Sequence, residues 1–270
     1  MDLATLLGLG LAVASLFISL IMEGGTLASL LNPSALVLIV GGTLGATMIS
    51  FSMRDVTRLP SFLSQAIKGA EPDTRGIVEA LVKCAELARK EGLMGLENKA
   101  STAPTPLMAH GLELAADAMD PEQVEMILSA EIAERQRQAK LGAEIMETAG
   151  GYSPTMGIIG TVMGLVHVLG NISNTEALAG AIAVAFLATF YGIAMANLLW
   201  LPLGGKLKQQ AKQQKVTDEV VMEGILAIIQ GTSPRLVRDK LETAAGLRAA
   251  PAVQKKAVLS GGEAVAERKA

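Results

Sequence analysis

The distribution of basic residues divides this chain of 270 residues into alternating blocks. All 23 Lys and Arg residues fall within residues 54–140 and 206–269, and residues 1–53 and 141–205 contain none. A charged side chain at the centre of a bilayer costs at least about 2.5–3.5 kcal/mol on insertion scales. The two stretches without basic residues are also rich in Leu, Ile, Val, Ala, Met and Gly. The pattern therefore predicts an integral membrane protein.

Each stretch without basic residues is long enough for two membrane-spanning helices, since one span needs about 20 mostly apolar residues. The expected spans are residues 3–22, 34–53, 149–169 and 178–199. The loops that join the paired spans lack Lys and Arg, so the positive-inside rule predicts that both termini and the long middle segment are cytoplasmic. The first span has no basic stretch before it and a second span follows closely, so we expect it to be retained rather than cleaved as a signal peptide.

The middle segment is predicted to be helical. Residues 74–91 carry apolar side chains on one helix face, and Gly92 is a plausible end. Further helices are expected to begin near Pro106 and at Pro121, where the preceding Asp can cap the helix and Pro can occupy its first position. No proline lies between Pro121 and Gly150, so this last helix is expected to enter the membrane without a break.

The predicted fold is an all-α polytopic membrane protein with four transmembrane helices and a helical cytoplasmic domain between the second and third. The expected segments are the first two spans with a short outer loop, the cytoplasmic domain, the last two spans, the C-terminal helices and a tail (1–53, 54–145, 146–205, 206–248 and 249–270). The composition of the tail predicts disorder.

The sequence offers no signature of an enzyme, a metal site or a cofactor. It contains no phosphate-binding loop, no GxSxG and no paired Cys or His spacing. A basic face interleaved with aromatic residues is also absent, which argues against nucleic acid as a partner. Cys84 is expected to be a half-buried residue on a soluble helix, and His110 a surface residue. His167 is expected to be a buried histidine hydrogen-bonded between helices rather than a proton relay.

Small and hydroxyl-bearing residues form a stripe on one face of each of the last two spans. Their spacing of three or four residues places each set on one helix face (Pro154, Gly157, Thr161 and Gly164; Ala181, Ala185, Thr189, Gly192 and Ala196). Close packing of helices explains the Gly and Ala positions. Pro154, Thr161 and Thr189 instead favour a path or a grip on a partner helix, because a proline beside a hydroxyl-bearing face is costly unless it has a use. Pro154 also frees the carbonyl of Gly150 and permits a kink.

The same two spans lack a charge that an ion path would need. Residues 150–174 and 178–205 contain no Asp, Glu, Lys or Arg. An ion path needs a titratable or coordinating group near the middle of the membrane. If these spans line such a path, a partner subunit must supply the carboxylate.

Six stretches of the sequence together resemble MotA/PomA-type flagellar stator proteins of the MotA/TolQ/ExbB proton channel family. They are "MDLATLLGLGLA", "VGGTLGATMISF", "ARKEGLMGLENK", "GYSPTMGIIGTVMGLVHVLGNI", "AIAVAFLATFYGIAMANLLWLPLGGKLK" and "EGILAIIQGTSPRLVRDKL". The resemblance covers the chain up to about residue 241. Four spans with a long segment between the second and third favour the stator branch over the ExbB and TolQ branch, which usually has three spans.

The resemblance implies a non-enzymatic subunit of the bacterial inner membrane that forms a ring, a pentamer in this family. The ring would surround a single-span MotB/PomB-type partner that carries the membrane aspartate. Ion flow through that assembly would turn the ring, and the cytoplasmic segment would push the rotor protein FliG. No cofactor is implied apart from the transported proton or sodium ion.

The resemblance also implies roles for particular residues. The family's rotor-facing charges fall on Arg89 and Glu97, with Lys90 beside the former. The family's proline in the third span falls on Pro154, and the proline that ends its fourth span falls on Pro202. Both prolines are expected to act in gating or as hinges.

The hydroxyl groups that line the family's ion path fall on Thr161 and Thr189. Sodium-driven members have two adjacent threonines where this chain has Ala188 followed by Thr189. Thr161 favours sodium and Ala188 favours protons, and we expect proton coupling.

Two other functions are compatible with a four-span protein of this kind. One is an ExbB/TolQ-like energiser that delivers the work of the ion gradient to an envelope partner instead of a rotor. The other is a self-contained transporter, which is disfavoured because such proteins usually carry their own charge near the middle of the membrane.

Overall fold

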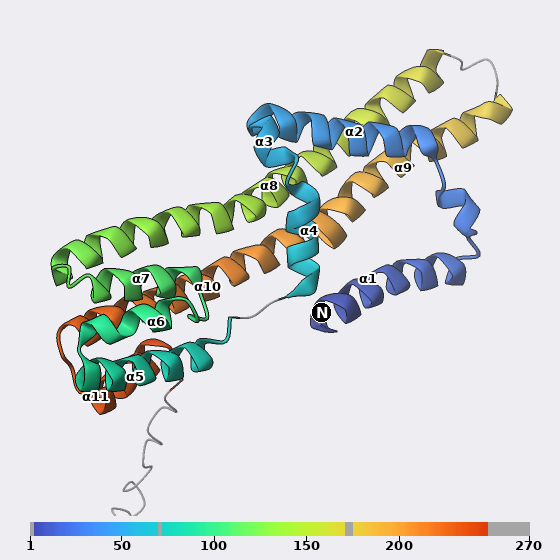
Figure 1. Ribbon diagram of the computed structural model, residues 1–270. Coiled ribbons are helices and arrows are strands. Elements are labelled where there is room, and N and C mark those ends of the chain that lie inside the picture. The colour runs from blue at the N-terminus through green and yellow to red at the C-terminus, as the bar shows by residue number, and fades with distance from the viewer. Residues whose placement is uncertain (1–2, 70–71, 171–174, 248–270) are drawn as a thin grey trace, which may run out of the picture. The chain divides into compact units, whose positions relative to one another are not determined.

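The computed structural model describes residues 3–69, 72–170 and 175–247, and this part of the chain is helical without a β-strand. The helices form two compact units (Figure 1). The first unit combines the described residues of 1–72 with residues 126–219, and the second combines residues 73–125 with the described residues from 220 onward. The predicted disordered tail lies outside the described residues.

The four predicted spans are confirmed as helices. They are α1 (Leu3–Met22), α2 (Pro33–Ser50), the second half of α8 (Pro121–Gly170), and α9 (Thr175–Met195) with the turn that follows it. All four are long and apolar enough to cross a membrane. Helix α8 has 50 residues. At 1.5 Å per residue it is about 75 Å long, so it continues far beyond a hydrocarbon core of about 30 Å.

Helix α2 and helix α1 differ sharply in how much they bury. Helix α2 begins at a cap in which the Asn32 side chain accepts a hydrogen bond from the backbone N–H of Ala35 at 3.0 Å. It packs against α9 and buries one face at every fourth position (Ala35, Ile39, Thr43 and Thr47). None of the apolar window of α1 is buried within the chain. The surface of α1 is therefore available to lipid or to other subunits.

Two short helices, α3 (Met53–Val56) and α4 (Leu59–Lys68), follow the second span. Helix α4 is amphipathic and buries Phe62 and Ala66 in a core that α8 and α10 (Leu201–Ile229) complete. The other members of this core are Ala143, Ile145, Met146, Ala149, Trp200, Leu203 and Leu207. Apolar packing thus continues past the end of the spans.

An ion pair also joins α8 to α10 within the first unit. Arg135 Nε lies 3.3 Å from a carboxylate oxygen of Asp218, and the other oxygen accepts a hydrogen bond from Gln214 at 2.8 Å. Asp218 is only 2% exposed. Because a buried carboxylate is costly without such partners, the pair ties the two helices to one relative position.

The second unit contains α5 (Thr74–Glu91), α6 (Glu97–Ala100), α7 (Pro106–Ala116) and α11 (Pro234–Ala244). The predicted helix at 74–91 and the predicted starts at Pro106 and Pro121 are confirmed. Gly92 follows α5 with a φ of +78°, which an L side chain rarely adopts. The unit closes around α5, which packs against α11, so residues from both ends of the chain share one core.

Candidate functional site

The contact between α8 and α9 depends on glycine. A Cβ atom on Gly192 would lie 2.6 Å from the carbonyl oxygen of Ser153, and one on Gly157 would lie 3.0 Å from that of Ala188. A Cβ on Gly164 would lie 2.6 Å from the Cβ of Ala185. The two backbones therefore approach more closely than any side chain would allow. The Gly and Ala positions serve helix packing, as predicted.

Two hydroxyl groups meet at this contact. The Oγ1 atoms of Thr161 on α8 and Thr189 on α9 lie 2.5 Å apart. The Thr161 hydroxyl is also 2.9 Å from the carbonyl oxygen of Ala185, and both hydroxyls are 3.2 Å from that of Gly157. The tertiary structure thus brings together the two residues that the sequence identified on separate spans.

The hydroxyl pair has oxygen atoms but no charge of its own. Each hydroxyl donates one hydrogen and accepts with two lone pairs, so the pair and its neighbouring carbonyls present several acceptors. Such an arrangement can bind a partner's donor, a water molecule or a hard cation. Both side chains are half-buried, so the site is open on one side. Ala188 is buried beside the pair and adds only a methyl group, which packs close to Gly160.

Pro154 lies inside α8 without ending it. The missing N–H leaves the carbonyl of Gly150 without its usual helical partner. Gly150 packs closely against Leu201, since a Cβ atom there would lie 2.6 Å from the Leu201 side chain. The neighbouring Ser153 is buried and donates a hydrogen bond from its hydroxyl to the carbonyl of Gly192 at 2.9 Å. The weakened turn of α8 is therefore held against the fourth span and its extension.

Pro202 lies where the fourth span passes into α10. The helical path does not stop there, because a π-helical turn at Ala196–Trp200 joins α9 to α10. The N–H of Leu201 bonds to the carbonyl of Ala196, five residues earlier, and Pro202 follows directly. Such turns are frequent at functional sites and local bends. The expected C-terminal helices are observed as α10 and as a further helix at Pro234–Ala244, but no pattern in the sequence predicted the π-helical turn.

The three residues with reactive side chains lie elsewhere. His167 is exposed on α8, so the predicted burial of this histidine between helices is wrong for the single subunit. His110 is half-buried rather than on the surface. Cys84 is 4% exposed, and this burial raises the pKa of its thiol, although Lys99 partly opposes the shift.

The predicted rotor-facing charges are exposed at one end of the second unit. Arg89 and Lys90 lie in the last turn of α5, and Glu97 begins α6. The 3₁₀ turn between them, Leu93–Leu96, is held in place by the fully buried Leu96. The same turn presents Met94, which is 79% exposed. Sequence periodicity missed Met94 because the turn follows neither a helical nor a strand repeat.

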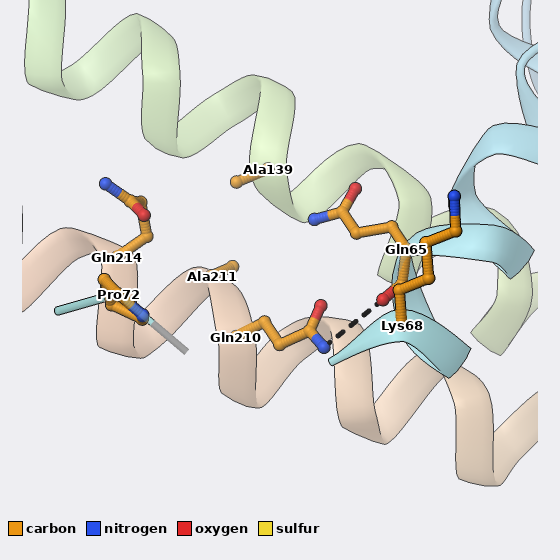
Figure 2. A pocket seen from close by; sticks show the side chains of 7 residues that line it. All are labelled: Gln65, Lys68, Pro72, Ala139, Gln210, Ala211 and Gln214. Atoms are coloured by element: carbon orange, nitrogen blue, oxygen red, sulfur yellow. Dashed lines mark hydrogen bonds between the residues drawn. The ribbon is translucent and has the colours of Figure 1, made fainter. Parts of the chain in front are cut away.

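A hollow of about 360 Å³ lies between α4, α8 and α10 (Figure 2). Its lining includes three glutamines and a lysine (Gln65, Lys68, Pro72, Ala139, Gln210, Ala211 and Gln214). The side chain of Gln210 donates to the carbonyl of Gln65 at 3.5 Å. The hollow contains no acid, and no group of three or more His, Cys, Asp or Glu that could hold a metal occurs in the described part of the chain.

Comparisons with known proteins cover nearly the whole chain. Residues 6–94 match the family described as Motility protein A N-terminal, and residues 99–218 match the MotA/TolQ/ExbB proton channel family. Motility protein A of Bacillus subtilis (strain 168) is 33% identical over 242 residues, which cover 89% of this chain and 90% of that protein.

Two solved structures have the same fold. The chain matches the structure of C. jejuni MotAB with a TM-score of 0.85 and 29% identity, over 90% of this chain and 96% of that one. It matches the flagellar MotAB stator complex from Bacillus subtilis with a TM-score of 0.81 and 32% identity, over 87% and 93% of the two chains.

Proposed function

Because the chain belongs to the Motility protein A group of the MotA/TolQ/ExbB proton channel family, we propose that Thr161 and Thr189 line the ion path of the flagellar motor stator of which it is a subunit. The hydrogen-bonded pair of hydroxyls at the α8–α9 contact carries this proposal. The pair is half-buried and lies in a segment without an acid. It is therefore suited to face a group from another chain.

The missing carboxylate identifies the partner by its chemistry. The related stator structures contain a MotB chain. We infer that a single-span subunit of that kind supplies an aspartate opposite the hydroxyl pair, and that copies of this chain surround it as a pentameric ring. Protonation or ion loading of the aspartate would change its hold on the ring, and the ring would turn. No cofactor enters this mechanism.

The gating role falls to Pro154 and Pro202. Pro154 weakens α8 beside the fourth span, and Pro202 follows the π-helical turn that joins α9 to α10. Pro154→Ala restores a helical hydrogen bond and should abolish torque, while assembly with the partner persists. Co-purification of the partner measures assembly, and cell tracking measures motility. Normal swimming by this variant would remove Pro154 from the mechanism.

Protons are the proposed coupling ion. Ala188 offers a methyl group where sodium-driven relatives are expected to have a second hydroxyl, so fewer oxygen ligands surround the path. Swimming speed should be recorded in cells that rely on this stator, with and without sodium at constant pH. Equal speeds are expected, and a speed that requires sodium would reverse the assignment.

The proposed contact with the rotor protein FliG consists of Arg89, Lys90 and Glu97 around the exposed Met94. Charge reversal by Arg89→Glu or Glu97→Lys should abolish swimming without changing the amount of protein in the membrane. The matched control is Arg235→Glu, which changes an exposed arginine on α11 of the same unit. An ExbB/TolQ-like energiser would tolerate all three changes, so unaffected motility would favour that alternative.

The protein resides in the inner membrane, and both termini are proposed to be cytoplasmic. The charge distribution supports this orientation, since Lys206 and Arg54 flank the spans on one side. Reporter enzymes active only outside the cytoplasm, fused after residue 25 and after residue 247, give opposite outcomes under this topology.

A further inference from the structure

A long groove runs along the first unit where α1 faces α4 and the junction of α9 with α10. Its volume is about 610 Å³. The first turns of α1 form one wall, Leu63 and Ile67 of α4 contribute the second, and residues 197–209 form the third. All of these residues belong to the same compact unit. The groove is therefore a feature of the single subunit.

The lining of the groove changes from apolar to polar along its length. Leucines dominate its membrane part, where Leu9 of α1 faces the groove with Leu199. Asn197 lies in that part too, but its side-chain amide already donates to the carbonyl of Ile193 at 2.9 Å. Lys206 and Gln209 lie at the other end, together with Thr5 near the start of α1. By the positive-inside rule, this polar end is the cytoplasmic one.

We propose that the groove holds an acyl chain of an anionic phospholipid from the cytoplasmic leaflet, with its phosphate at Lys206. The proposal goes beyond the motor function and does not depend on which ion drives it. An apolar groove beside a bilayer favours a hydrocarbon chain over water. A lysine at the membrane surface buries its stem along apolar surface and places its ammonium group at the level of the lipid phosphates.

The exposure of α1 favours a lipid over another segment of this chain as the occupant of the groove. None of the apolar window of α1 is buried by the rest of the chain. A lipid chain in the groove would contact both α1 and α4, and would fill space that the helices leave. It would thus fasten the first span to the amphipathic helix that follows the second.

Two glycines of α1 provide a matched test of the apolar part. A side chain added at Gly8 or at Gly10 meets no atom within 4 Å, so leucine is tolerated sterically at both positions. Gly8 lines the groove, whereas Gly10 does not. Gly8→Leu therefore fills the groove, and Gly10→Leu makes the same chemical change on another face of the helix.

The measurement is the phospholipid retained by the intact stator complex after purification in mild detergent, counted by native mass spectrometry. The unmodified protein and Gly10→Leu should retain a phospholipid on each chain, and Gly8→Leu should lose it. Retention by Gly8→Leu equal to that of Gly10→Leu would overturn the proposal. So would an unmodified complex that carries no phospholipid.

A second comparison tests the headgroup assignment. Lys206→Gln should lower the preference for phosphatidylglycerol over phosphatidylethanolamine about fivefold, as expected for one lysine at a membrane surface. Lys212→Gln removes the same charge from the same helix at a position outside the groove, and should leave the preference unchanged. An unaltered preference in Lys206→Gln would contradict the placement of the phosphate.

The competing occupant is a neighbouring copy of this chain. A photo-crosslinking amino acid in place of Gly8, in the assembled complex in native membranes, should become attached to lipid. A crosslinked product with the mass of two chains would overturn the lipid assignment in favour of a subunit contact. The motility of the same cells tests the stator function separately. A variant that loses the lipid but swims normally supports the lipid site and leaves the proposed stator function unaffected.

Discussion

The α8–α9 contact and the interior of the unit around α5 are both buried, yet they are built from opposite kinds of side chain. Glycine, alanine and two threonines form the first, with backbones in near contact. Large apolar residues fill the second (Ile77, Val78, Leu81, Val82, Leu96, Leu107, Met108, Leu112, Val237 and Leu241). Burial alone therefore does not decide which residues a helix contact uses.

The two kinds of helix contact use different side chains because one is surrounded by lipid and the other by water. In water, burial of large apolar side chains drives association. The second unit, which contains none of the four spans and is called the aqueous unit below, therefore gains stability from each leucine that it encloses. Lipid is as apolar as leucine, so helices in the membrane gain instead from close approach and from hydrogen bonds. Substitutions that remove volume should harm the aqueous unit most, and substitutions that add volume should harm the membrane contact most.

Removal of volume from the aqueous unit should have the largest effect. Leu81 is completely buried on α5, and Leu81→Ala should destabilise the fold by about 2–5 kcal/mol because it leaves a cavity. Leu236→Ala on α11 is the control, since Leu236 is exposed and its loss should cost little. Thermal unfolding of the purified protein measures both. Equal melting temperatures for the two variants would contradict the assigned core.

Addition of volume to the membrane contact should come next. Gly192→Ala forces a methyl group against the backbone of Ser153, and overpacking of this kind costs about 1–3 kcal/mol. Gly180→Ala changes the same helix at a position where a Cβ meets no atom within 4 Å, so it should be neutral or slightly stabilising. Retention of the partner subunit after detergent extraction measures the effect. A harmless Gly192→Ala would show that the backbones lie farther apart.

The threonines of the membrane unit allow a subtler comparison. Thr161→Val removes a hydroxyl from the pair with Thr189, and should slow rotation while costing stability by about 1 kcal/mol. Thr43 is also buried, but its hydroxyl has no hydrogen-bond partner among the residues that the structure describes. Thr43→Val should therefore raise stability and preserve speed. Swimming speed and melting temperature separate the two, and equal speeds would remove Thr161 from the ion path.

The smallest expected effect is on the labelling rate of Cys84, which tests the packing of the aqueous unit alone. Burial raises the pKa of its thiol, so the reactive thiolate is scarcer at neutral pH than on an ordinary cysteine, and its fraction grows only as the pH rises toward the raised pKa. Maleimide labelling of the folded protein at pH 7 should be slow. A cysteine introduced by Met94→Cys in a Cys84→Ala background should react quickly, and the opposite order would contradict the burial of Cys84.

Much of the fold was predictable because its signals are local. The exclusion of charge from the spans, the cap and proline at Pro121 and the glycine after α5 each act within a few residues along the chain. The predicted burial of His167 was wrong, because the exposure of one side chain depends on how closely the neighbouring helices pack around it and not on its own stretch of sequence. The π-helical turn and Met94 were missed because neither produces a regular repeat in the sequence.

The candidate site was also predictable only in part. The resemblance to known stators identified Thr161 and Thr189 separately, and their spacing placed each on a small-residue face. The hydrogen bond between them requires α8 and α9 to lie close together, and glycines on both helices make this close approach possible.

The sequence by itself determined the number of spans and their approximate positions, because the cost of charge in a bilayer acts on each residue independently of the fold. It also predicted that an ion path through these spans needs an acid from another chain. Tertiary structure decided which spans pack together, how two distant segments share the core around α5, and where α1 leaves a groove. Those features depend on contacts between residues far apart in the chain, and no local pattern encodes the geometry of such contacts.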